Sequence, residues 1–261
     1  TQEESHCLPI SSRKESVNGR IIIKNDLVMR VGTTLLFKDG YCYQSYGWNM
    51  LRPLGALQNA LEHLDKYELD EICIIRPIRD NDDTYHQDLK LLREAKSSTP
   101  LAFGGGIRNL NDIELLEGMP VERYVVSSAL FNKNIALIER LHAKYGEQSI
   151  IGFVPFSLTK QLRVFNSQKD CFQSPQSLNI SALRLCDEVV LHDCDSEGDY
   201  AGFKIEAVSA LGIDKNKLIF SGGVSEMVKN DASILVKPKS ILIDNKILHR
   251  ENSKKAYYGA M

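Results

Sequence analysis

The chain has 261 residues, of which 43% are hydrophobic and 25% are charged. This composition excludes an intrinsically disordered chain, because disorder needs low hydrophobicity and high net charge. The 32 Lys and Arg residues against 34 Asp and Glu give a formal net charge of −2, which argues against binding of nucleic acid through bulk charge. The longest apolar runs are far shorter than the roughly 18 residues that a membrane span needs. We therefore expect a globular protein that binds neither nucleic acid nor membrane.

Six cysteines are spread along the chain, and no two of them form a CxxC pair. A zinc site of the common spacing is therefore not expected. No GxSxG, HExxH or Walker motif is present either, and we expect neither a metal nor a cofactor. We interpret the cysteines as reduced thiols, which predicts a cytoplasmic protein.

Residues 1–20 are polar and without period, which is typical of a flexible arm. From residue 21 to 261, short apolar runs alternate with amphipathic stretches, and we expect a single domain there. The predicted strands are Leu35–Phe37, Glu71–Ile75, Pro100–Phe103, Tyr124–Val126, Ser149–Val154, Glu188–Leu191, Lys217–Phe220 and Ser240–Ile243. The clearest helical patterns lie at Ala56–Tyr67, Tyr85–Lys96, Asn111–Glu117 and Ala136–Tyr145. Eight strand-then-helix units predict an α/β fold, a parallel (β/α)8 or TIM barrel.

The second half of the chain repeats the first at an offset of 117 residues. Asp70-Glu71-Ile72 recurs as Asp187-Glu188-Val189, and the glycine-rich segment Phe103–Ile107 recurs as Phe220–Val224. The predicted strands Leu35–Phe37 and Tyr124–Val126 map onto Gly152–Val154 and Ile241–Ile243. An open doubly wound sheet is the alternative, but it would not require this copy. We therefore predict a barrel built from two half-barrel repeats.

The ligand site of a parallel barrel lies at the carboxyl ends of its strands. Glycine-rich turns follow the third and seventh predicted strands, and polar turns follow the fourth and eighth. Glycine lets backbone N–H groups approach an anion closely, so two matched cradles suit a ligand with two phosphates. The alternative is that the glycines only permit tight turns. The predicted phosphate-binding residues are Gly104, Gly105, Gly106, Ser127, Ser128, Gly198, Gly222, Gly223, Asn245 and Lys246.

Two other turns at the same end carry charged side chains. The segment 191–202 follows the sixth predicted strand and holds four acidic residues and one histidine, whereas Lys38 follows the first strand. A carboxylate in such a loop could act as a general acid or base, and Lys38 could contact an anion. The alternatives are a solvated loop and an ordinary turn lysine. We predict Lys38 and Asp195 as catalytic residues.

These features together resemble the histidine-biosynthesis barrels, and most closely the cyclase subunit of imidazole glycerol phosphate synthase, HisF. The resemblance is carried by the half-barrel repeat, the turns at Gly104–Ile107 and Ser221–Gly223, the loop at Asp193–Gly198 and the Asp-Glu pairs before the second and sixth strands. It extends from about Val28 to Arg250. It implies a phosphorylated small-molecule ligand and a HisH-like glutaminase partner, whose ammonia crosses the barrel interior.

The chain departs from this family at the catalytic positions. The family's two catalytic aspartates match Leu36 and Pro155 here, and neither residue can transfer a proton. The resemblance therefore implies that the acid/base pair of the ordinary cyclase, a lyase, is missing, and it leaves open whether the chain is an enzyme. The segment Leu35–Gly40 is similar to that of homologues found with surface-polysaccharide pathways, which implies a separate sugar amidotransferase as a further partner.

A charged gate at the amino-terminal mouth of the family's barrel matches Arg30, Glu71, Arg123 and Glu188. Charges at a barrel bottom are costly unless they are paired. The balanced signs therefore predict a salt-bridged ring that serves as an ammonia gate. The alternative is four ordinary strand-start charges that face solvent.

Three functions are compatible with these observations. The first is a HisF-like subunit of a glutamine amidotransferase system, which binds a phosphorylated ligand and conducts ammonia. The second is a stand-alone barrel that binds or acts on a sugar phosphate or nucleotide, and the third is a catalytically silent scaffold. Trp48, the single tryptophan, lies near the rim and could cap a ligand, dock a partner or pack against the barrel.

Overall fold

The computed structural model describes residues 29–48, 50–78, 82–132, 135–198, 202–224 and 238–243. The predicted arm at 1–20 lies outside these residues. Within them, twelve strands form one sheet. Eight of these strands pair in parallel and close a ring in the order β1, β4, β5, β6, β7, β10, β11 and β12. The predicted TIM barrel is therefore confirmed.

The barrel strands coincide with the eight apolar runs of the sequence. They are β1 (Arg30–Lys38), β4 (Glu71–Ile75), β5 (Leu101–Gly104), β6 (Arg123–Val126), β7 (Ile150–Ser157), β10 (Glu188–Asp193), β11 (Leu218–Ser221) and β12 (Ser240–Ile243). Strands of a parallel sheet are covered on both faces and are therefore almost continuously apolar. A layer of side chains fills the barrel interior: Cys73, Ala102, Val125, Ile151, Phe153, Val190, Ile219 and Leu242.

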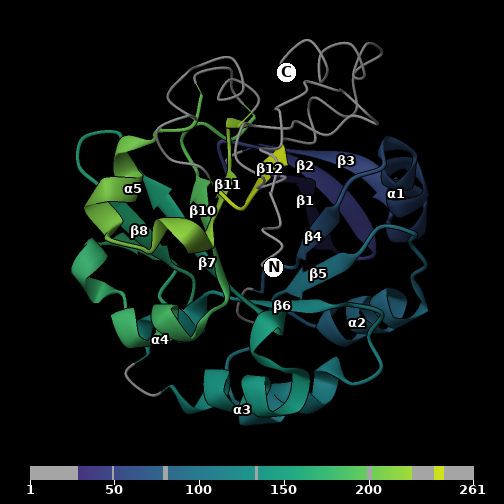
Figure 1. Cartoon of the computed structure of the whole chain (residues 1–261). Coiled ribbons are helices and arrows are strands. Elements are labelled where there is room, and N and C mark those ends of the chain that lie inside the picture. Colours follow the sequence, from purple (N-terminus) through teal and green to yellow (C-terminus); the bar gives the residue numbers. More distant parts are fainter. Residues whose placement is uncertain are drawn as a thin grey trace, which may run out of the picture.

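Helices surround the barrel (Figure 1). The α-helices are α1 (Leu57–Leu64), α2 (Tyr85–Glu94), α3 (Ala136–Tyr145), α4 (Ile180–Leu185) and α5 (Glu206–Leu211). Short 3₁₀ helices are η1 (Asp65–Tyr67), η2 (Leu110–Leu116), η3 (Ser128–Phe131), η4 (Glu147–Ser149), η5 (Pro175–Ser177) and η6 (Lys215–Lys217). Helix α1 buries Leu57, Ala60, Leu61 and Leu64, the spacing of one helical face. None of the helices in the described ranges has both the length and the apolar character that a membrane crossing requires.

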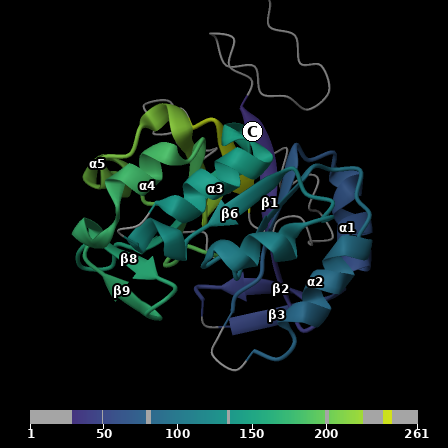
Figure 2. The same cartoon turned by 90° about the horizontal axis from the view of Figure 1, so that it is seen from below.

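Two β-hairpins, which the sequence patterns did not predict, extend the barrel at its carboxyl end. Strands β2 (Tyr41–Tyr46) and β3 (Met50–Ala56) follow β1, and β8 (Arg163–Asn166) and β9 (Cys171–Gln173) follow β7. Both hairpins pair antiparallel with the strand that precedes them. Figure 2 shows them at the same end of the molecule. The hairpins are equivalent elements of the two half-barrels.

The strand register corrects one part of the predicted repeat. Glu71 on β4 lies opposite Gly32 on β1, whereas its repeat partner Glu188 on β10 lies opposite Ile151 on β7. The equivalent of Gly32 is therefore Ile151, and β7 is shifted by two residues relative to the 117-residue offset of the other strands. The mapping of Leu35–Phe37 onto Gly152–Val154 was wrong. The corrected register makes Leu36 equivalent to Pro155.

Candidate functional site

Five charged side chains meet at the amino-terminal end of the barrel. Lys239 Nζ lies 3.5 Å from Glu188 Oε1, and the other four form shorter ion pairs. Arg30 donates to Glu188 Oε2 at 2.5 Å, and Nε of Arg123 donates to Glu71 Oε1 at 2.6 Å. Arg123 also forms an ion pair with Glu188. Arg30, Glu188, Arg123 and Glu71 are thus linked in a continuous series of ion pairs, which we call the charge cluster.

The two carboxylates of the charge cluster are buried, with Glu71 4% and Glu188 3% exposed. Burial by itself raises the pKa of Glu188, but the guanidiniums of Arg123 and Arg30 outweigh it and hold this pKa below its usual value. Burial likewise lowers the pKa of Arg123, but Glu71 and Glu188 outweigh it and raise this pKa. Arg123 and Glu188 therefore both remain charged at neutral pH.

Replacing Glu188 with glutamine is expected to cost about 3 kcal/mol at pH 7, because a buried partner of two arginines loses its charge. The pKa of Glu188 is lowered in the folded state, so its contribution is complete above the unfolded pKa of about 4.3 and disappears as the pH falls through the folded pKa. Urea unfolding of the wild type and E188Q between pH 3 and 8 measures the difference. A difference that is constant down to pH 3 would contradict this assignment.

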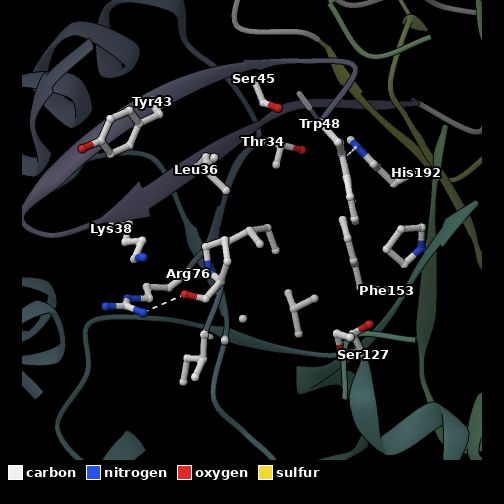
Figure 3. Close-up of a pocket in the computed structure, with 18 of the residues that line it drawn as sticks. Thr34, Leu36, Lys38, Tyr43, Ser45, Trp48, Arg76, Ser127, Phe153 and His192 are labelled. Atoms are coloured by element: carbon white, nitrogen blue, oxygen red, sulfur yellow. Dashed lines mark hydrogen bonds between the residues drawn. The ribbon is translucent and has the colours of Figure 1, made fainter. Parts of the chain in front are cut away.

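A pocket of about 550 Å³ opens at the opposite, carboxyl end of the strands. Figure 3 shows Lys38 and Arg76 on one side of it and Trp48, His192 and Phe153 on the other. Leu36 and Pro155 both line this pocket. An apolar side chain thus stands at each position where the resemblance to the cyclase implies a catalytic aspartate.

Most of the predicted phosphate-binding residues converge on this pocket. Its lining includes Gly104, Gly105, Gly106, Ser127, Ser128 and Gly198. Gly222 and Gly223 do not line it, although Ser221 before them does, and Asn245 and Lys246 lie outside the described residues. The Oγ of Ser127 is buried and has no hydrogen-bond partner among the described residues, so it can donate to a ligand.

The two glycine turns are built alike. Gly105 has a φ of +142°, and a Cβ there would overlap the carbonyl oxygen of Arg76. Gly222 has a φ of +83°, and a Cβ there would overlap the carbonyl oxygen of Asp193. Arg76 and Asp193 are equivalent in the repeat. Arg76 follows Ile75, which lies opposite Gly104, and Asp193 follows His192, which lies opposite Ser221. Each glycine therefore allows one turn to pack against the end of the preceding barrel strand.

Lys38 lies at the end of β1 and lines the pocket. The turn after it is held by Asp88, which accepts from the backbone N–H groups of Asp39 at 3.0 Å and Gly40 at 2.7 Å. Asp88 is in turn paired with the fully buried Arg76, whose Nε donates to it at 2.8 Å. Burial by itself lowers the pKa of Arg76, but the bonds to Asp82 and Asp88 outweigh it and raise this pKa. The buried ion pair therefore positions the turn that carries Lys38.

Asp195 is engaged by its neighbours and does not line the pocket. Its carboxylate accepts from Ser157 Oγ, the backbone N–H of Leu158 and Lys204 Nζ, each at 2.8 Å. Burial by itself raises the pKa of Asp195, but Lys204 and these hydrogen bonds outweigh it and lower this pKa. The geometry is that of a carboxylate that links the loop after β10 to the end of β7.

The titratable pair that does line the pocket is His192 and Glu197. His192 Nε2 lies 3.4 Å from Glu197 Oε1 and accepts a hydrogen bond from Trp48 Nε1 at 3.0 Å, and His192 Nδ1 lies 3.0 Å from Ser221 Oγ. Burial by itself raises the pKa of Glu197, but His192, Ser45 and the N–H of Trp48 outweigh it and lower this pKa. Both residues belong to the segment 191–202, which was predicted as a possible acid/base site, but their pairing was not predicted. The alternation of inward residues on β10, Glu188, Val190 and His192, is the signal that would have found the histidine.

Comparison with protein families agrees with this architecture. The model of the family described as histidine biosynthesis protein matches residues 49–252.

The chain belongs to the histidine biosynthesis protein family.

Relatives within the histidine biosynthesis family include two kinds of barrel. A protein of Leptospira interrogans named as a candidate HisF subunit of imidazole glycerol phosphate synthase is 28% identical over 185 residues, which cover 68% of this chain and 72% of the relative. A candidate HisF subunit of Vibrio vulnificus is 26% identical over 69% of this chain and 72% of that protein. A carboxamide isomerase with two phosphoribosyl groups in its name, from Clostridium botulinum, is 24% identical over 73% of this chain and 80% of its own length.

Proposed function

We propose that this chain is a HisF-like subunit of a glutamine amidotransferase system, which holds a phosphorylated small molecule at the carboxyl end of the barrel and conducts ammonia from a HisH-like glutaminase through the barrel. The single observation that carries this proposal is the charge cluster, which closes the barrel at the end opposite the pocket. A barrel that only binds a ligand at its other end does not need four buried or half-buried charges there. Apolar residues would close this end of the barrel at a smaller cost in free energy.

The barrel interior supports ammonia conduction. Between the charge cluster and the pocket lies the apolar layer that includes Cys73, Ala102 and Val190. Desolvation disfavours the charged ammonium ion in such surroundings and favours neutral ammonia.

The pocket supports an anionic ligand. Gly105, Lys38 and Ser127, whose Oγ has no partner among the described residues, line one cavity, and this set of potential donors suits a phosphate group. Because Leu36 and Pro155 replace proton-transferring groups, the proposal does not include the ordinary cyclase reaction. In the proposed scheme the ammonia passes to an acceptor that a separate sugar amidotransferase holds.

The proposal is tested by purifying the tagged chain from cells that also produce the HisH-like glutaminase of the same genome, and by assaying glutaminase activity in the eluate. We expect a stable complex whose glutaminase activity exceeds that of the separate glutaminase at least about tenfold, or about 1.4 kcal/mol in the barrier. A chain that elutes alone would overturn the proposal and favour a stand-alone barrel or a silent scaffold.

Two matched charge reversals show which end of the barrel binds the glutaminase. Glu122 is exposed and precedes β6 at the amino end, and Asp83 is exposed in the loop after β4 at the carboxyl end. E122K should weaken the complex, whereas D83K, with the same change in charge, should leave it intact. The reverse result would place the partner on the wrong face for ammonia transfer.

A further inference from the structure

The indole of Trp48 connects the two hairpins across the mouth of the pocket. Trp48 lies in the turn between β2 and β3, with a φ of +59°. Its ring meets the ring of Phe165, on β8, edge-on with 4.9 Å between centroids, and its Nε1 donates to His192 Nε2 on the barrel wall. Figure 3 shows the indole directly beside His192 and above Phe153. The side chain therefore covers part of the cavity opening.

The hydrogen bond to the indole defines the protonation state of His192. An indole N–H is only a donor, so His192 Nε2 must be the acceptor and carry no proton. The proton of the neutral ring then lies on Nδ1, which donates to Ser221 Oγ at 3.0 Å. The hydrogen bond from the indole thus belongs to the neutral ring in one tautomer, whereas the pairing that lowers the pKa of Glu197 belongs to the imidazolium.

Protonation of His192 reverses the role of Nε2. An imidazolium has two N–H donors, so Nε2 can no longer accept from the indole of Trp48. A charged acceptor is already in place, because Glu197 Oε1 lies 3.4 Å from the same nitrogen. Among the described residues, the other side chains that contact the ring are Phe153 on β7 and Ser221 on β11, and neither carries a charge. Asp193 and Asp195 point their carboxylates to Ser196 and Lys204 instead.

We propose that His192 is a pH-sensitive positioning residue: its neutral form holds the Trp48 indole over the pocket, and its protonated form pairs with Glu197 and releases the indole. The backbone of the hairpin stays anchored in both states. Glu197 Oε2 accepts from Ser45 Oγ at 2.7 Å and from the N–H of Trp48 at 3.1 Å, and Gly47 N–H donates to the carbonyl of Glu197 at 2.9 Å. The moving part is the indole alone, and its release separates it from Phe165 and widens the mouth.

The movement of the indole would regulate access to the pocket. This inference rests on the proposed function only for the identity of the ligand that enters. Its test needs neither ligand nor glutaminase, so its failure and the failure of the glutaminase experiment are distinguishable. Trp48 is the single tryptophan of the chain, so the fluorescence of the whole protein reports on this indole.

The experiment is a pH titration of tryptophan fluorescence, with acrylamide quenching at each pH. We expect a one-proton transition in both signals. Acrylamide quenching should rise about twofold on the acidic side, because the residue is 36% exposed while the indole is held. The matched control is H192Q, whose amide can still accept from the indole but does not titrate, so both signals should stay constant.

Two further results distinguish the mechanism. In E197Q the anion that stabilises the imidazolium is gone while the hydrogen-bond acceptor oxygen remains, so the transition should move to lower pH. A wild-type transition that persists unchanged in H192Q would overturn the proposal. Loss of fluorescence intensity without greater acrylamide quenching would also overturn it, because the imidazolium would then quench an indole that has not moved.

Discussion

Replacing Gly105 with alanine is expected to destabilise the barrel by about 3–5 kcal/mol. The new Cβ would overlap the carbonyl oxygen of Arg76, and that oxygen belongs to the backbone and cannot rotate away. Gly105 also has a φ of +142°, which an L-residue rarely adopts. Backbone strain and overpacking therefore act together at this turn, and such combinations account for the largest effects of single substitutions.

The matched control is Gly118→Ala. Gly118 has a φ of +71°, but a Cβ there meets nothing within 4 Å. This substitution should cost only the conformational penalty, about 1 kcal/mol. Urea unfolding of the wild type, G105A and G118A measures the difference between the two costs. Equal losses would mean that the close approach of the glycine turn to the end of β4 contributes nothing to stability.

The second large effect is expected at Arg76. Its guanidinium is fully buried, and Asp88 is only 1% exposed. Replacing Arg76 with methionine leaves Asp88 and Asp82, whose side chain is 4% exposed, without their cation, which we expect to cost about 3–5 kcal/mol in urea unfolding. The turn at Asp39 and Gly40 depends on Asp88, so the position of Lys38 should be lost as well.

A double substitution separates the buried charge from the lost packing. Removing the charge of Asp88 as well lowers the cost, because only one of the two buried carboxylates, Asp82, then lacks its cation. R76M/D88N should therefore be more stable than R76M by about 1–2 kcal/mol, even though it carries one more substitution. A double variant that is less stable than R76M would show that the ion pair is not the source of the effect.

The barrel could be predicted from the sequence because its strands are buried on both faces. Segments such as Glu71–Ile75 and Ser240–Ile243 are short apolar runs, and the predicted bounds are those of β4 and β12. The hairpins could not be found in this way. Tyr41–Tyr46 alternates aromatic and small or polar residues, and its partner Met50–Ala56 is largely exposed, so neither segment shows an apolar run. The intervening turn at Gly47 and Trp48, both with positive φ, lacks the Asn-Gly or Asp-Gly pair that is the strongest hairpin signal in a sequence.

The pocket was predicted at the correct end of the barrel, but the side chains within it were harder to assign. An acidic loop does not reveal which carboxylate faces the cavity, because this depends on how the loop folds back. Asp195 turns toward Lys204, whereas Glu197, two residues later, faces His192. The contact between Trp48 and His192 joins residues 144 positions apart, and it exists only because an unpredicted hairpin brings the indole to β10.

The charge cluster takes its members unequally from the two halves of the chain. Arg30, Glu71 and Arg123 come from the first half-barrel, and Glu188 comes from the second. In a folding intermediate with only the first half formed, two guanidiniums, those of Arg30 and Arg123, would lie near one carboxylate, that of Glu71. Arg30 would then lack Glu188, its partner in the closed barrel. Contacts between residues so distant in sequence form late, since loop closure must be completed first. Arrival of β10 therefore supplies the carboxylate that Arg30 lacks in the first half alone, while Lys239, 3.5 Å from Glu188, brings a further cation from the second half.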